Sequence, residues 1–203
     1  MYTVLFILIA YLLGSISFAL VTSKLFGLDD PRTYGSGNPG ATNVLRTGNK
    51  FAALLTLIGD AAKGWVAVYL TNIFADQFNI GKWGIAGVAL AAFIGHLFPL
   101  FARFRGGKGV ATGLGVLLGI NPMFGLFVLL TWIMVAFLTR YSSLSALIAA
   151  LLAPVYYGVM FQVDTNFYAV CIITALLIYR HRKNISNLIS GKESKIGSKK
   201  KAS

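Results

Sequence analysis

Residues 110–138 read VATGLGVLLGINPMFGLFVLLTWIMVAFL, and the topology of the whole chain depends on how this run is divided. A helix that crosses a bilayer needs about 20 mostly apolar residues, so the run is too long for one simple crossing. It is interrupted at Asn121-Pro122, a dipeptide that favours turns. Two helices joined there would return the chain to the side it came from, whereas one long helix would not.

The composition points to the lipid bilayer as the solvent for most of the chain. Of the 203 residues, 57% are hydrophobic and only 12% are charged, about half the charged fraction of a soluble domain. The other long apolar runs approach the length of a bilayer crossing. These runs are Tyr2–Val21, Phe51–Phe74, Gly84–Ala102, Ser143–Phe161 and Asn166–Tyr179.

The distribution of positive charge decides between one helix and two. The chain has 18 Lys and Arg against six Asp and Glu, and cytoplasmic loops are enriched in Lys and Arg. With a turn at the break, sixteen cations fall on one side, Lys82 falls on the other, and Lys63 lies inside a span. Without it, Arg140 and the eight cations from Arg180 onward change sides. We therefore predict an all-α integral membrane protein with seven transmembrane helices, the N terminus outside and the C terminus cytoplasmic. Because the segment before the break is short, we expect short or partly re-entrant helices near the cytoplasmic face.

The first predicted cytoplasmic loop carries a glycine-rich motif, GSGNPGATN at residues 35–43, followed by a cation. Glycines alternating with small polar side chains can turn several backbone N–H groups toward one anion. An ordinary turn-rich loop is the alternative, because glycine alone is a weak signal. The candidate phosphate-binding residues are Gly35, Ser36, Gly37, Asn38, Thr42, Asn43 and Arg46, with Thr42 or Asn43 as a cap for the short helix that follows.

The second cytoplasmic loop places a lysine among glycines, in the stretch FARFRGGKGVAT at residues 101–112. Backbone N–H groups and the Lys108 ammonium can there approach one phosphate together. The spacing is not that of a nucleotide-binding P-loop, because Lys108 is followed by glycine rather than Ser or Thr. Arg103 and Arg105 fit membrane anchoring as well as they fit a site. The candidate phosphate-binding residues around Lys108 are Gly106, Gly107, Gly109 and Thr112.

A third polar motif, YRHRKNI at residues 179–185, follows the last apolar run. His181 and Asn184 are three residues apart and share one face of a continuing helix. A histidine can accept or orient a hydroxyl proton near neutral pH. The alternative is an interfacial cluster of cations that reach from the membrane to water. Ser143 lies on the same predicted side of the membrane.

Three ionisable residues fall within apolar runs. Asp60 and Lys63 are three apart and can pair, which reduces the cost of placing charge in the membrane. We favour a structural pair over one that orients the first loop. His96 fits a buried, hydrogen-bonded histidine better than a site residue. One cysteine, Cys171, two distant histidines and few carboxylates argue against a metal site or an acyl-cysteine.

The three motifs GSGNPGATN, FRGGKGVAT and IYRHRKNI, in this order between these apolar runs, resemble the bacterial acylphosphate:glycerol-3-phosphate acyltransferase family, PlsY. The resemblance extends from the first span to Ile189. It implies transfer of a fatty acyl group from acyl phosphate to the sn-1 hydroxyl of glycerol 3-phosphate, giving lysophosphatidate and phosphate in phospholipid synthesis. As in that family, the H-x4-D motif of other glycerolipid acyltransferases is absent, because Phe101 and Ser186 stand five residues after the two histidines.

The implied reaction needs neither an enzyme nucleophile nor a cofactor, because an acyl phosphate is already an activated mixed anhydride. No covalent acyl-enzyme is expected. His181 would orient the attacking hydroxyl or take its proton, and a phosphate oxygen of the donor is the alternative base. Ser143 and Asn184 would position glycerol 3-phosphate. The expected catalytic set is His181, Lys108, Asn184 and Ser143, and the expected phosphate ligands are Ser36, Arg46 and Lys108.

We expect residues 1–191 to form a single domain and residues 192–203 a basic, disordered cytoplasmic tail near anionic headgroups. The expected partners are the two substrates and membrane lipids, without nucleic acid, and a monomer can enclose the site. The predicted location is the bacterial inner membrane, with the active site facing the cytoplasm. The main alternative is a transporter of a phosphorylated anion, which would place its site near the midplane. A scaffold that binds anionic lipid through its tail is the third reading.

Overall fold

The computed structural model describes residues 2–197, which form ten α-helices and two short 3-10 helices, with no strand among these residues. The all-α class predicted from the sequence is confirmed. The elements are α1 (Tyr2–Gly14), α2 (Phe18–Leu25), α3 (Ala41–Val44), η1 (Leu45–Thr47), α4 (Lys50–Phe74), α5 (Lys82–Leu97), η2 (Leu100–Ala102), α6 (Val110–Ile120), α7 (Pro122–Thr139), α8 (Ser142–Met160), α9 (Thr165–Arg180) and α10 (Arg182–Ile189).

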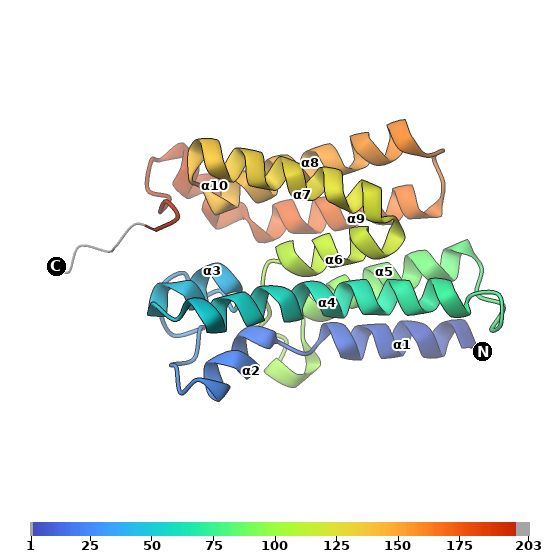
Figure 1. Cartoon of the computed structure of the whole chain (residues 1–203), viewed down its shortest axis with the longest axis horizontal. Helices are drawn as coiled ribbons and strands as arrows, with labels where there is room; N and C mark the ends of the chain where they lie inside the picture. The colour runs from blue at the N-terminus through green and yellow to red at the C-terminus, as the bar shows by residue number, and fades with distance from the viewer. Residues whose placement is uncertain (1, 198–203) are drawn as a thin grey trace.

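The long helices run along the long axis of the molecule in two groups, with α6 between them (Figure 1). One group contains α1, α4 and α5, and the other contains α7, α8 and α9. The central helix α6 packs against α4 and α5 on one side and against α7 and α9 on the other. The loop that leads into α6 is therefore positioned by both halves of the bundle.

Glycines allow α4 and α6 to cross closely. A methyl group at Gly64 would overlap the backbone of Thr112, and one at Gly115 would overlap the backbone of Ala61. Small residues at such crossings let membrane helices approach backbone to backbone. The start of α6 is thereby held at a defined place against α4.

The predicted break within residues 110–138 is present. The side chain of Asn121 caps α7 by accepting a hydrogen bond from the Phe124 N–H at 3.1 Å. Pro122 occupies the first turn of α7, where its missing N–H leaves no bond unmade. Since α6 and α7 pack against each other, the chain reverses direction at this turn.

The first apolar run is bent rather than straight. The helix α1 ends at Gly14, α2 begins at Phe18, and the two axes differ by 41°. Between them, the Ile16 carbonyl accepts a hydrogen bond from Lys63 Nζ of α4 at 2.6 Å. The ammonium of a neighbouring helix thus binds a carbonyl that a continuous helix would bond internally.

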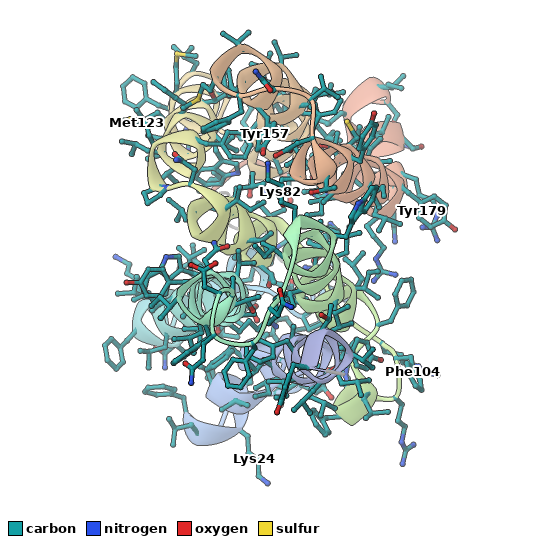
Figure 2. All side chains as sticks on the ribbon, turned by 90° about the vertical axis from the view of Figure 1, so that its right-hand side faces the viewer. Lys24, Lys82, Phe104, Met123, Tyr157 and Tyr179 are labelled. Carbon is teal, nitrogen blue, oxygen red and sulfur yellow. The ribbon has the colours of Figure 1, made fainter. Side chains whose placement is uncertain are left out.

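The described chain has four helices long and apolar enough to cross a membrane, namely α4, α5 with its extension to Ala102, α7 and α8. The bent pair α1 and α2 makes a fifth if it counts as one crossing, and α6 and α9 are apolar but shorter. The number seven therefore stays a prediction. Viewed from the end at which α1 begins, the outward-facing side chains, such as that of Met123, are mostly carbon (Figure 2).

The loops that carry the first and third polar motifs lie at the opposite end, where α3 and α10 lie (Figure 1), and the second loop reaches them through the contact of Lys108 with Asn184 of α10. Residues 192–197, the start of the tail that we expected to be disordered, contact the bundle at this end. There the Ile196 N–H donates to the Arg140 carbonyl at 2.7 Å. Residues 198–203 lie outside the described part of the chain. Lys82, the one loop cation assigned to the other side, begins α5 at the far end (Figure 2).

Candidate active site

Lys108 and Asn184 bring the second and third polar motifs together. Lys108 lies on the loop before α6, and its Nζ donates a hydrogen bond of 2.6 Å to Asn184 Oδ1 in α10. Burial lowers the pKa of the Lys108 ammonium, and the nearby Glu193 carboxylate opposes this shift. The charge is thus partly removed from water, where its attraction for an anion is stronger than at an open surface.

Glu193 joins Asn184 to Ser143. Its Oε1 accepts hydrogen bonds from Asn184 Nδ2 at 2.7 Å and from Ser143 Oγ at 2.6 Å. The amide of Asn184 is thereby oriented, with its nitrogen toward Glu193 and its oxygen toward Lys108. Sequence alone places Glu193 in the basic tail and assigns it no role. The available signal was that it is the one acid in the basic segment after residue 180.

Arg180 holds the backbone of the second loop. Its Nη2 donates to the Gly106 carbonyl at 2.8 Å, and its Nε and Nη2 donate to the Gly107 carbonyl at 3.1 and 2.9 Å. From the opposite direction, the Gly107 N–H donates to the His96 carbonyl at 3.2 Å. Gly109 then enters α6 with φ +87°, a conformation that favours glycine. Sequence alone accounts for Arg180 only as part of the one-sided positive charge.

The first loop is shaped by Asn43. Its Oδ1 accepts from the Ser36 N–H at 3.0 Å, and its Nδ2 donates to the carbonyls of Pro31 at 2.7 Å and Tyr34 at 3.2 Å. Both the oxygen and the nitrogen of the Asn43 amide are therefore bonded to backbone groups of the first loop, as expected for a residue that shapes this loop. The following helix α3 is capped by Gly40 without a side-chain hydrogen bond, so the expected capping by Thr42 or Asn43 is wrong.

Arg46 stands on the same end of the molecule with its side chain along Gly35 of the first loop. Its Nη2 donates to Ser194 Oγ at 2.7 Å, which links the first loop to the segment after α10. Arg46 also lines an open hollow together with Asp29 and Tyr34. Thr42 Oγ1 lies 3.4 Å from Ser142 Oγ, so the start of α8 adjoins this loop.

His181 lies between α9 and α10, and only 2% of it is exposed. Its Nδ1 is 2.8 Å from the Leu177 carbonyl oxygen, which can only accept, so Nδ1 carries the proton and Nε2 is left as an acceptor. Burial lowers the pKa of His181 to about 4, the Leu177 hydrogen bond opposes the shift, and the Lys108 charge adds to it. The imidazole is therefore neutral at physiological pH.

The remaining candidate residues of the first and second loops differ in their burial and in their contacts. Thr112 is fully buried where α6 crosses α4, and its hydroxyl has no hydrogen-bond partner among the described residues. Asn38 lies beside Gly40 within the first loop. Arg103 and Arg105 are exposed, as membrane anchors would be. Within residues 2–197, no three His, Cys, Asp or Glu side chains lie together as ligands of a metal ion would.

Fold and site together define an all-helical integral membrane protein in which the cation of a glycine-rich loop, Lys108, is hydrogen-bonded to the helix that follows His181. The family model described as glycerol-3-phosphate acyltransferase matches residues 4–191. The chain belongs to this family.

Relatives and solved structures agree with the family. The chain is 62% identical to the glycerol-3-phosphate acyltransferase of Cupriavidus pinatubonensis, over 99% of this chain and 100% of the relative. It is 61% identical to that of Janthinobacterium sp. (strain Marseille), with the same coverage. Two crystal structures of PlsY, an integral membrane glycerol 3-phosphate acyltransferase, are 38% identical and cover 97% of this chain and 96% of their own. The glycerol 3-phosphate form gives a TM-score of 0.90 and the lysophosphatidic acid form 0.88.

Proposed function

We propose that this protein transfers a fatty acyl group from acyl phosphate to the sn-1 hydroxyl of glycerol 3-phosphate, with lysophosphatidate and phosphate as products. The family supports the acceptor, and the crystal structures named for glycerol 3-phosphate and lysophosphatidic acid support it further. The observation that carries the proposal is the Lys108–Asn184 hydrogen bond, because it joins a phosphate-binding type of loop to the motif that holds His181. One site then contains both an anion-binding cation and a group able to handle a hydroxyl.

Acyl phosphate and glycerol 3-phosphate each carry one phosphate, and the cations and hydrogen-bond donors of the site are shared between them. Lys108 and Arg46 supply positive charge, and the backbone N–H groups of the two glycine-rich loops add uncharged donors. Asn184 has a second Nδ2–H beyond the one that Glu193 takes, and Ser143 Oγ keeps its acceptor lone pairs. These free groups position the glycerol 3-phosphate, and Ser36 contacts phosphate at the first loop.

The chemical step needs no protein nucleophile. The sn-1 hydroxyl oxygen forms a bond to the acyl carbon, the bond between that carbon and the phosphate oxygen breaks, and phosphate leaves with the electron pair. Lys108 stabilises the charge that develops on the donor phosphate. Cys171 lies within α9 and takes no part.

His181 orients the hydroxyl through Nε2 and does not keep its proton. With a pKa of about 4, the imidazole is a weaker base than a phosphate whose second pKa is about 6. The proton therefore ends on the departing phosphate. The sequence offers two candidate bases, His181 and a phosphate oxygen of the acyl donor. The low pKa of His181 favours the donor phosphate.

The acyl chain has an apolar surface to follow. A hollow of about 360 Å³ between α4 and α6 is lined by Ile58, Ala62, Trp65 and Leu118, together with Ala61 and Gly115. These two helices lead toward the loop that carries Lys108, so a chain lying there would extend from the site into the lipid. We place the site on the cytoplasmic side of the bacterial inner membrane, with seven crossings, on the strength of the one-sided charge.

The test is an assay of the purified protein with acyl phosphate and glycerol 3-phosphate, followed by detection of lysophosphatidate by mass spectrometry. Acyl-CoA and acyl carrier protein replace the donor in parallel. Product from acyl phosphate alone supports the proposed donor. Uptake of glycerol 3-phosphate into vesicles without any lysophosphatidate would instead favour the transporter.

A further inference from the structure

A polar cluster lies buried between α4, α5 and the bend of the first helix pair. Asp60, Lys63 and His96 are only 2%, 5% and 6% exposed. Lys63 Nζ is 2.8 Å from Asp60 Oδ1, 2.6 Å from the Ile16 carbonyl oxygen and 3.0 Å from His96 Nδ1. Lys63 Nζ thus donates to the Ile16 carbonyl and to His96 Nδ1, and its contact with Asp60 is an ion pair without hydrogen-bond geometry. The predicted pairing of Asp60 with Lys63 is confirmed, and His96 extends it.

The lysine determines the orientation of the histidine ring. Because an ammonium donates and cannot accept, His96 Nδ1 is the acceptor, and the neutral ring carries its proton on Nε2. A methyl group added at Gly107 would overlap this Nε2 and approach Cε1 to 2.9 Å. The ring of His96 therefore lies directly against Gly107, the residue that precedes Lys108.

Gly107 is enclosed on several sides. The His96 carbonyl accepts from its N–H at 3.2 Å, and Arg180 donates to its carbonyl. The Pro39 carbonyl of the first loop lies 3.0 Å from the place that a methyl group would take. A change in the His96 ring must therefore be felt by the backbone that carries Lys108.

If the polar cluster only held α4 and α5 together, the His96 ring would not need to lie against Gly107. Charged side chains inside a membrane are costly even when paired, and α4 and α5 also pack through apolar residues such as Val68 and Val88. The polar cluster ends at the second loop, where a displacement of the reacting groups by about 1 Å can cost about a hundredfold in rate.

We infer that Asp60, Lys63 and His96 form a positioning network that sets the backbone at Gly107 and so presents Lys108 to the substrate phosphate. This inference rests on the proposed acyl transfer. None of the three is assigned contact with substrate: they act through the loop.

The first test separates the ring from the hydrogen bond. His96→Asn keeps an acceptor for Lys63 but removes the ring atoms that lie against Gly107. Purified variants are compared in kcat/KM for glycerol 3-phosphate and in thermal unfolding temperature. We expect His96→Asn to lose about tenfold or more in kcat/KM, with an unfolding temperature close to that of the control. The control is Thr56→Val, which removes a buried hydroxyl of α4 that lies 2.6 Å from Thr22 Oγ1, away from the loop.

The second test is compensation at the contact itself. Gly107→Ala alone places a methyl group into the His96 ring and should abolish most activity. In the His96→Asn background the overlap with the ring is removed and the close contact with the Pro39 carbonyl remains, so the double variant should lose less than the product of the two single losses. Lys63→Arg keeps the charge beside Asp60 and should retain more activity than Lys63→Met.

Equal activity of His96→Asn and Thr56→Val, or an identical loss from Gly107→Ala in both backgrounds, would overturn the inference. If His96→Asn fails to fold, the comparison of Lys63→Arg with Lys63→Met decides: equal activity of the two overturns it. Failure of the wild-type chain and Thr56→Val to make any lysophosphatidate would contradict the proposed function instead, so the two failures are distinguishable.

Discussion

Lys108 and Asn184 are 76 residues apart in the sequence and are joined by a hydrogen bond of 2.6 Å between Nζ and Oδ1. The bond connects the loop before α6 to the helix α10 that follows His181. In the proposed reaction neither motif alone makes a complete site, because one supplies the cation for phosphate and the other supplies the groups for a hydroxyl. Their union is the structural basis of the proposed acyl transfer.

Removal of the Lys108 ammonium should affect catalysis more than any other single change in the second loop. We expect Lys108→Ala to lower kcat/KM by well over an order of magnitude, because a preorganised charge at a reacting phosphate is lost. Lys82→Ala, at the far end of the molecule, serves as the control and should retain wild-type activity. Steady-state kinetics with both substrates measure this. A loss no larger than that of the control would remove Lys108 from the mechanism.

His181 should not titrate in the physiological range. Since burial lowers its pKa to about 4, the ring is neutral throughout pH 5 to 8, the range in which an ordinary histidine changes charge. We expect His181→Asn to lower kcat without changing the shape of the pH–rate profile in that range. An inflection near pH 6.5 that is present in the wild type and missing in the variant would contradict this account.

The same shift makes folding stability depend on pH. Between pH 6.5 and about 4 the unfolded chain binds a proton at His181 that the folded chain does not, so stability falls as the pH falls. The difference corresponds to about 3 kcal/mol between the two ends of this window. Thermal unfolding in detergent at several pH values should show a steeper acid loss for wild type than for His181→Asn. Parallel curves would contradict the assigned burial.

Glu193 should matter through its oxygen rather than its charge. Glu193→Gln keeps an acceptor for Ser143 and Asn184 and should retain most activity. Glu193→Ala leaves both donors without their partner and should cost about tenfold, consistent with hydrogen bonds worth about 1–3 kcal/mol. Lys192→Ala, exposed and adjacent, is the matched control. If alanine and glutamine behave alike, the orienting role of Glu193 is wrong.

Arg180 should not tolerate replacement by lysine. Its guanidinium donates to two successive carbonyls, and a lysine ammonium lacks that fork geometry. We expect Arg180→Lys to lower kcat/KM by about tenfold, whereas Arg182→Lys, whose guanidinium lies over the Tyr179 ring at the surface, should be near wild type. Comparable kinetics for the two variants would show that the clamp has no influence on Lys108.

The features that could be predicted from the sequence are those set by residues close together in the chain. Asn121-Pro122 breaks the long apolar run because both residues act locally, one as a cap and one as the first residue of α7. Asp60 and Lys63 pair because helical spacing puts them on one face. One-sided charge also predicted that the second and third polar motifs lie on one side, and the Lys108–Asn184 hydrogen bond joins them.

The features that sequence missed depend on contacts between distant segments. The bend after Gly14 requires Lys63 from another helix. Arg180 and Glu193 acquire roles only when α9 and the segment after α10 meet the second loop and α8. Thr112, which looked like part of a phosphate loop, is instead buried where α6 crosses α4. Local pattern does not encode these crossings.

The most direct measurement is product formation by the purified chain in detergent, supplied with acyl phosphate and glycerol 3-phosphate. The account predicts one lysophosphatidate and one phosphate per acyl phosphate consumed, no acylated protein by intact mass, and loss of turnover in Lys108→Ala. A folded wild-type protein that forms no lysophosphatidate from acyl phosphate would contradict it.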